Sequence, residues 1–255
     1  MDQDETGVLD MRLKVLSSVA LAASLALAIG TSAHAATNLV TNGSFTSSAY
    51  AAGTNNQFGT GFGGQGVTGW TGNGGYNIWF GGSPQTNAVS QYPTTGEHFG
   101  PNFNALSPDG GAFVALDGDT DVQGGISQIL TGLDTTKSYT LTFDWAGAQL
   151  ANRNGATTEQ FQVSFGGQTF FTPVLSVPDQ GFSGWHTATM VFTPTSATQT
   201  LSFLSIGTPG NLPPMAVLDG VSLTVPEPAT WAMMLVGFGG IGAMIRRRRQ
   251  TLVAA

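Results

Sequence analysis

Large apolar side chains occupy every second position in two central stretches of the chain. Residues 139–145 read Tyr-Thr-Leu-Thr-Phe-Asp-Trp, and residues 161–165 read Phe-Gln-Val-Ser-Phe. A repeat of two residues places all the large side chains on one face of a β-strand, whereas a helix repeats every 3.6 residues. Gly166-Gly167 then supplies a two-residue hairpin turn into a further strand at Gln168–Phe171. These stretches therefore predict antiparallel strands that are buried on one side.

Other short apolar segments have the same character and are bounded by glycine, aspartate or proline. They are Phe113–Leu116, Gly125–Leu130, Trp185–Phe192, Gln199–Ile206 and Ala216–Leu223. Residues 37–105 are irregular by comparison, and glycine and aromatic residues crowd the stretch from Gly59 to Gly82. No helical periodicity is visible between residues 36 and 225. We therefore predict an all-β fold, a β-sandwich or jelly roll over residues 36–225, with a glycine-rich insertion at about 51–105.

Charge excludes several classes of partner for residues 36–225. Lys137 and Arg153 are the only basic residues in this range, against ten acidic residues, which gives a formal charge of −8. A domain this acidic repels nucleic acid and anionic lipid head groups. The chain contains no cysteine, so neither a disulfide framework nor thiol chemistry is available to it.

The first 35 residues contain the pattern of a secretory signal. Residues 1–10 are acidic, but from Met11 the chain shows a basic start, an apolar stretch and the small-x-small sequence Ala33-His34-Ala35. We interpret residues 11–35 as a signal peptide cleaved after Ala35. Residues 1–10 then represent a misassigned start; the alternative is a genuine extension.

A second apolar segment lies near the C-terminus. The 17 residues from Ala229 to Ile245 carry no charge, and as a helix they would span about 26 Å of a hydrocarbon core ~30 Å thick. The four arginines that follow favour the cytoplasmic side for this end of the segment. Prolines at 226 and 228 limit the start of the helix to about Ala229. The pattern predicts a single transmembrane helix over 229–245.

The sequence Pro-Glu-Pro before this helix resembles the PEP-CTERM sorting signal of Gram-negative surface proteins, in its PEPxxWA form. The matching residues are Pro226, Glu227, Pro228, Trp231, Ala232, Arg246, Arg247, Arg248 and Arg249. The resemblance implies a sorting segment over 226–250 that an exosortase-type membrane protease processes in the inner membrane. It also implies a membrane-anchored precursor that reaches the cell surface, the outer envelope or the extracellular matrix.

Both ends of the predicted domain resemble bacterial surface domains with a galactose-binding-like jelly roll. The resemblance rests on Asn38–Phe45, on Gly69-Trp70 and on Val217–Leu223. Many members of that superfamily are carbohydrate-binding modules with a structural calcium ion. The glycine-rich insertion departs from a compact module.

No catalytic residue emerges from the sequence. There is no G-x-S-x-G motif, and the two histidines of the domain lack metalloenzyme spacing. Glycoside hydrolysis needs two facing carboxylates, and the sequence does not pair any. We therefore predict a non-enzymatic protein, with a polysaccharide-acting glycosidase or lyase as the alternative.

Two sets of residues are candidates for calcium. Asp117, Asp119 and Asp121 alternate along one loop and could supply oxygen ligands to a hard cation. The superfamily resemblance instead implies a site near Asn42 and Asp219. The alternative for the aspartate cluster is an acidic turn between strands.

Trp70, Tyr76 and Trp79 are candidates for binding carbohydrate, because aromatic faces stack on sugar rings. The alternative is that these tryptophans pack into the sandwich. Taken together, the sequence predicts a surface or exopolysaccharide-associated module, whose ligand would be a neutral polysaccharide. A matrix protein with no ligand is the alternative.

Overall fold

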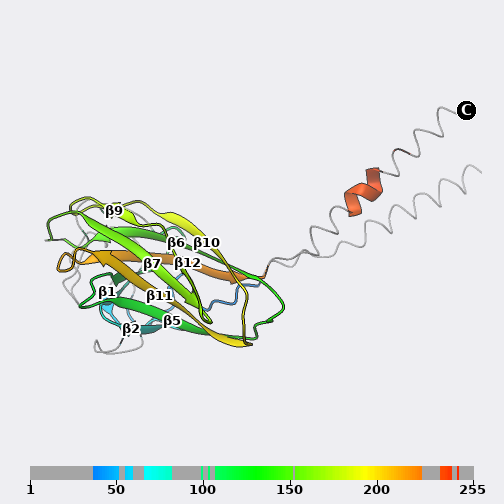
Figure 1. The fold of residues 1–255 in the computed structure, drawn as a ribbon, viewed down its shortest axis with the longest axis horizontal. Coiled ribbons are helices and arrows are strands. Elements are labelled where there is room, and N and C mark those ends of the chain that lie inside the picture. Colours follow the sequence, from blue (N-terminus) through cyan, green and yellow to red (C-terminus); the bar gives the residue numbers. More distant parts are fainter. Residues whose placement is uncertain are drawn as a thin grey trace, which may run out of the picture. The chain divides into compact units, whose positions relative to one another are not determined.

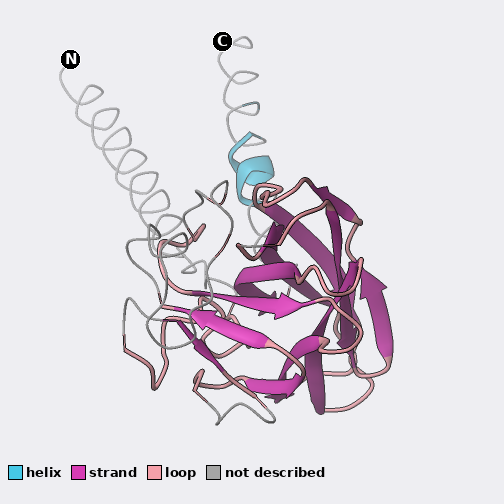
Figure 2. Ribbon diagram, turned by 90° about the vertical axis from the view of Figure 1, so that its left-hand side faces the viewer, coloured by secondary structure: helices cyan, strands magenta, loops and turns pink. Residues whose placement is uncertain are grey.

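The computed structural model describes residues 37–51, 55–59, 66–81, 99, 103, 107–151, 153–225, 236–242 and 246. Two compact units emerge: Ala36–Pro228, and a second unit that combines Met1–Ala35 with Ala229–Ala255. Strands dominate the first unit (Figures 1 and 2).

Two antiparallel sheets make up the Ala36–Pro228 unit. The first sheet has the order β1-β3-β4-β12-β6-β10. Its strands are β1 (Asn55–Gln57), β3 (Asn77–Phe80), β4 (Phe113–Asp117), β12 (Pro214–Thr224), β6 (Tyr139–Gln149) and β10 (His186–Phe192).

The second sheet has the order β2-β5-β11-β7-β8, with β9 paired to β7 as well; β2, β5, β11 and β7 can be followed in this order in Figure 1. Its strands are β2 (Thr71–Gly74), β5 (Gly124–Thr131), β11 (Thr198–Thr208), β7 (Thr157–Phe165), β8 (Gln168–Phe171) and β9 (Leu175–Val177).

The connectivity is that of a jelly roll. From β4 onward, the chain forms two sets of four strands that face each other: β4-β12-β6-β10 in the first sheet and β5-β11-β7-β8 in the second. In a jelly roll of eight strands, the first pairs with the last and the second with the seventh, and β4–β12 and β5–β11 repeat this rule. The predicted all-β sandwich is confirmed.

The main core lies between the two sheets and is rich in aromatic rings. Phe203 of β11 lies at its centre, 5.1 Å from Phe143 and 5.9 Å from Phe161 between ring centroids, both in edge-to-face contact. Trp145 packs edge-to-face on Phe161 from the opposite sheet. These are the residues that the two-residue repeat placed on one face, so the alternation positions the core as predicted.

A second hydrophobic cluster covers the outer face of the first sheet over β3, β4, β12 and part of β6. Phe99 and Phe103, from the glycine-rich insertion, stack on each other with centroids 4.2 Å apart and contact Phe113 of β4. Met215 and Val217 of β12 lie beneath them and are fully buried. The central strands of the first sheet are thus buried on both faces, which explains the continuous apolar runs at Phe113–Leu116 and Ala216–Leu223.

Most predicted strand ends agree with the structure to within two residues, but β6 extends four residues beyond the predicted 139–145 and β7 begins four residues before the predicted 161–165; β9 was not predicted. Gly166 and Gly167 both have positive φ angles, 54° and 87°, as the predicted two-residue hairpin requires. The region 37–105 is less irregular than expected, because β1, β2 and β3 form within it. These three strands are short, and each pairs with strands distant in the sequence.

Residues 236–242 are helical. Among the residues that the structure describes, no helix has both the length and the hydropathy needed to cross a membrane. The predicted signal peptide and most of the predicted helix over 229–245 lie outside the described residues.

Candidate functional site

The outer face of the second sheet is left bare by the described residues and carries no ionisable side chain. Its strands alternate, so that core residues such as Phe203 have outward-facing neighbours such as Ser202 and Leu204. The outward residues are Thr71, Asn73, Ser127, Ile129, Thr131, Thr158, Gln160, Gln162, Ser164, Thr169, Phe171, Thr198, Thr200, Ser202, Leu204, Ile206 and Thr208. Most of them carry a hydroxyl or a carboxamide. We call this surface the neutral face.

The outer face of the first sheet differs in charge. Asp144 of β6 and Asp219 of β12 are paired across neighbouring strands there, and Asp109 contacts the same region through Ser107. The described acidic residues of the domain lie on the first sheet or in loops, except Glu159, which faces the core from β7; the neutral face is thus an uncharged surface in a domain of formal charge −8.

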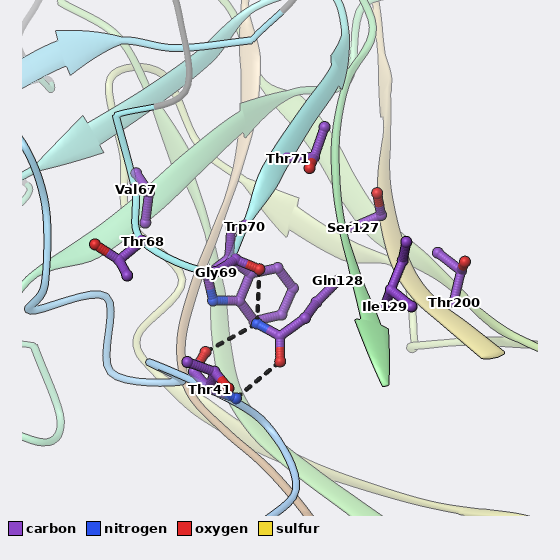
Figure 3. A pocket seen from close by; sticks show the side chains of 10 residues that line it. All are labelled: Thr41, Val67, Thr68, Gly69, Trp70, Thr71, Ser127, Gln128, Ile129 and Thr200. Atoms are coloured by element: carbon purple, nitrogen blue, oxygen red, sulfur yellow. Dashed lines mark hydrogen bonds between the residues drawn. The ribbon is translucent and has the colours of Figure 1, made fainter. Parts of the chain in front are cut away.

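A pocket of about 690 Å³ opens at one corner of the neutral face (Figure 3). Strands β5 and β11 supply Ser127, Ile129 and Thr200 to it, β2 supplies Thr71, and the loop before β2 supplies residues 67–70. Ile129 is 67% exposed, which is unusual for a large apolar side chain on a β-strand. The lining combines several hydroxyl groups with this one apolar surface, a composition suited to a neutral, hydroxylated molecule.

Gln128 holds the two loops that wall the pocket (Figure 3). Its Oε1 accepts a hydrogen bond from the Thr41 N–H at 2.8 Å, and its Nε2 donates to the carbonyls of Thr41 and Gly69, both at 2.9 Å. The side chain is only 6% exposed, so these bonds are shielded from water. The wall is therefore fixed before any ligand arrives.

The structure shows the packed alternative for both candidate tryptophans. Trp70 and Trp79 are each 2% exposed, and their indole N–H groups donate to the carbonyls of Asn42 at 3.0 Å and Phe45 at 2.8 Å. Trp70 borders the pocket, but neither ring offers an open face for a sugar. Tyr76 packs partly buried against the second hydrophobic cluster. The three aromatic candidates therefore do not meet on one surface.

The aspartate loop forms a hydrogen-bonded turn. Asp117 accepts the Asp119 N–H at 2.8 Å, and Asp119 accepts the N–H groups of Asp121 at 3.1 Å and Asn211 at 2.5 Å. These backbone donors lower the pKa of Asp119 below its usual value. Asp121 is exposed. Within the described part of the chain, no three acidic, histidine or cysteine side chains are grouped to hold a metal ion.

The second calcium candidate does not form a shared cage of oxygen atoms. The Asn42 amide donates to the carbonyls of Ser47 and Thr68 and accepts the Ser47 N–H, all at 2.9 Å. Asp219 is instead bonded to the Ser107 hydroxyl and to the Gly220 N–H. Burial raises the pKa of Asp219 to about 8.

Ser107 joins two carboxyl groups. Its hydroxyl bonds Asp219 and, at 2.8 Å, Asp109. A single hydroxyl proton cannot serve both carboxylates, so the bridge fits a protonated Asp219 that donates to Ser107 while Ser107 donates to Asp109. The raised pKa of Asp219 agrees with this arrangement.

Glu159 is the other buried acid, and sequence reasoning did not single it out. It faces inward from β7, is fully buried, and accepts a hydrogen bond from Thr157 Oγ1 at 2.5 Å. Its Oε2 has no hydrogen-bond partner among the residues that the structure describes. Burial raises the pKa of Glu159 to about 8. The alternation in residues 157–165 was the available signal, because it places position 159 on the core face.

Comparison with known proteins assigns most of the chain to one family. A family model described as a protein of unknown function, DUF642, matches residues 38–223. The chain belongs to the DUF642 family. The match covers both sheets, the neutral face and the pocket. Among curated proteins, none matches the chain.

The segment after the DUF642 domain matches a second family model, the PEP-CTERM protein-sorting motif, over residues 224–249. This confirms the motif seen in the sequence. Arg246 is helical. The other predicted sorting residues (Pro226, Glu227, Pro228, Trp231, Ala232, Arg247, Arg248 and Arg249) and the predicted cleavage residues Ala33 and Ala35 lie outside the described residues.

Solved structures similar to the DUF642 domain include carbohydrate-binding modules. TmCBM61, in complex with β-1,4-galactotriose, is 13% identical, with 74% of this chain and 99% of that chain covered and a TM-score of 0.42. The CBM22-1 xylan-binding domain of Xyn10C from Paenibacillus barcinonensis is 15% identical, with 70% and 96% covered and a TM-score of 0.35. An arabinose-bound α-L-arabinofuranosidase, MgGH51, is 12% identical, with 74% and 26% covered and a TM-score of 0.40. The galactan and xylan ligands belong to those proteins.

Proposed function

We propose that this DUF642 protein is an exported, non-enzymatic surface protein that binds a neutral polysaccharide through the neutral face. One observation carries the proposal. In a domain of formal charge −8, a bare sheet face of hydroxyl and carboxamide groups is free of charge and ends in a preformed pocket. Neutral polysaccharides are bound through hydrogen bonds and apolar contacts, and both kinds of group are present there.

Export and sorting complete the proposal. Residues 11–35 direct secretion and are removed after Ala35. The segment over 229–245 then holds the precursor in the inner membrane, while an exosortase-type protease acts near Pro226–Pro228. The PEP-CTERM motif at residues 224–249 supports this route. The processed protein resides at the cell surface, in the outer envelope or in the extracellular matrix.

Among the described residues, no carboxyl group lines the pocket or the neutral face, which supports a binding protein over a glycosidase at that site. In glycosidases the two catalytic carboxyls flank the sugar at a separation of about 5–9.5 Å. Asp109 and Asp219 instead share the Ser107 hydroxyl, which leaves no room for a sugar between them. Glu159 faces the core and not a surface.

A charge placed on the neutral face tests the proposal. Ser202 lies at the centre of this face, so Ser202→Asp should abolish binding because the new carboxylate must lose its water when a neutral chain covers it. Thr189→Asp is the matched control, because Thr189 is exposed on the outer side of β10 in the other sheet. Affinity gel electrophoresis in neutral polysaccharides measures the retardation. If the wild-type protein is not retarded by any neutral polymer, the ligand-free matrix protein is the better description. If polymer is degraded during the run, the protein is an enzyme.

A further inference from the structure

One line of residues across the neutral face consists of hydroxyl side chains only. The strand register pairs Thr71 with Ser127, Ser127 with Ser202, Ser202 with Ser164, and Ser164 with Thr169. These five residues come from five neighbouring strands, in the order β2, β5, β11, β7 and β8. Ser164 and Thr169 are close enough for their hydroxyl oxygens to bond, at 3.3 Å. We call this line the hydroxyl row.

The spacing of the row is set by the sheet. Neighbouring strands lie about 4.8 Å apart, so five strands present five hydroxyl side chains over about 19 Å. The spacing of about 4.8 Å between neighbouring strands is close to the length that one pyranose ring adds to an extended glycan. A chain laid across the strands would therefore meet one hydroxyl side chain of the protein for each sugar unit, whereas a chain laid along a strand would meet a different row at every step.

The row ends in the pocket. Thr71 and Ser127 belong both to the row and to the pocket lining. Beyond them lie the loops of Thr41 and of residues 67–70, which Gln128 fixes in place. A chain that follows the row toward β2 thus reaches the border of a preformed recess that extends along β5 toward Ile129 and Thr200, while at β8 the row runs out at the edge of the sheet, beside the exposed Phe171.

We propose that the neutral face takes an extended, unbranched neutral glycan that lies across the strands and places one terminal sugar in the pocket. This inference rests on the proposed function. It adds the direction of the chain, the length of chain that is recognised, and the preference for a chain end.

Oligosaccharide length and the position of a lost hydroxyl test the inference together. The full chain is purified in a detergent without a sugar head group, because glycosidic detergents would compete for the face. Cello-, xylo- and β-1,4-galacto-oligosaccharides of two to six units are titrated by calorimetry. Affinity should rise with length up to about five units and then level off, because the row has five positions.

Thr71→Val and Thr169→Val remove a hydroxyl at opposite ends of the row and keep the β-branched shape. Thr71→Val should weaken every oligosaccharide by about three- to tenfold, since a neutral hydrogen bond contributes that much. Thr169→Val should weaken only those of five or more units, because Thr169 is the fifth position of the row. Thr189→Val on β10 is the control and should change nothing. Borohydride reduction opens the sugar at one end of the pentamer, and methylation modifies the sugar at the opposite end. Only one of the two modifications should weaken binding, and that one identifies the end that lies in the pocket.

Three results would overturn the inference. Thr169→Val could weaken the dimer as much as the hexamer, affinity could keep rising beyond six units, or both modified pentamers could bind like the parent. If the protein still binds polymer but none of the short oligosaccharides competes for that binding, the face binds the interior of a chain and not its end. That outcome refutes the chain-end site and leaves the proposed function standing. If the protein binds neither the oligosaccharides nor the polymer, both the chain-end site and the proposed function are refuted.

Discussion

At the scale of single residues, Trp70 and Trp79 decide between a binding role and a packing role. Each ring is 2% exposed and each indole N–H is bonded to a backbone carbonyl. Trp70→Ala and Trp79→Ala should each lower the free energy of unfolding by about 3–5 kcal/mol, because both a large buried surface and a buried hydrogen bond are lost.

Urea denaturation measures this effect, with Phe171→Ala as the control. Phe171 is 54% exposed, so its removal should change stability little. A Trp70→Ala protein that is as stable as the wild type but no longer binds polysaccharide would restore the sugar-stacking interpretation.

Asp119 decides whether the acidic loop is a metal site or a turn. Its carboxylate accepts two backbone N–H groups, so Asp119→Asn should lower the melting temperature whether or not calcium is present. The measurement compares melting in 2 mM EDTA and in millimolar calcium. If calcium stabilises the wild type by mass action and the variant loses that gain, the loop is a calcium site after all.

At the scale of elements, the strands from residue 113 onward were predictable except β9, whereas β1, β2 and β3 were not. The alternating residues 139–145 and 161–165 predict β6 and β7, because one face of each strand packs in the core and the other faces outward. β2 reads Thr-Gly-Asn-Gly and has almost no apolar content. It forms because β5 offers an edge to pair with, and that edge is more than 50 residues away in sequence.

The candidate site could not be predicted from the sequence for a related reason. Ser127, Ser202 and Thr169 are unremarkable in the sequence, and they form a line only once the register of five strands is known. The tryptophans drew attention because aromatic residues are chemically distinctive, but the same large apolar surface places them in the core. The sequence identified the sorting motif more easily, because its residues are adjacent in the chain and are read without a fold.

The sorting segment carries its own prediction. A plain membrane anchor should tolerate Pro226→Ala combined with Glu227→Gln, since the apolar run and the arginines are unchanged. For a sorting signal, we expect the double variant to accumulate uncut in the inner membrane. Fractionation and immunoblotting of full-length precursor measure this, with Thr251→Ala as a control outside the motif. Normal processing of the double variant would argue for simple anchoring.

At the scale of the whole molecule, two buried acids make stability depend on pH. The pKa values of Glu159 and Asp219 are raised to about 8, against about 4 in an unfolded chain. Between these values the folded state holds protons that the unfolded state releases. The free energy of unfolding should therefore fall as pH rises from about 4 to 8.

Chemical denaturation at pH 5, 6, 7 and 8 measures the slope. Glu159→Gln cannot ionise, so its stability should fall less steeply than that of the wild type, by the contribution of one group. Parallel curves for the two proteins would mean that Glu159 does not hold a proton in the folded state.

The covering of the first sheet by Phe99 and Phe103 also limits what the protein does to a matrix. With its central strands covered on one side and the neutral face open on the other, a single copy acting as proposed would contact a polymer through one face only. It would coat one polymer chain without cross-linking two, so the stiffness of a gel would be unaffected by free copies. Only copies attached to a common surface would link the polymer to that surface. Attachment of the protein, and not its affinity for the polymer, would then decide whether the polymer is anchored.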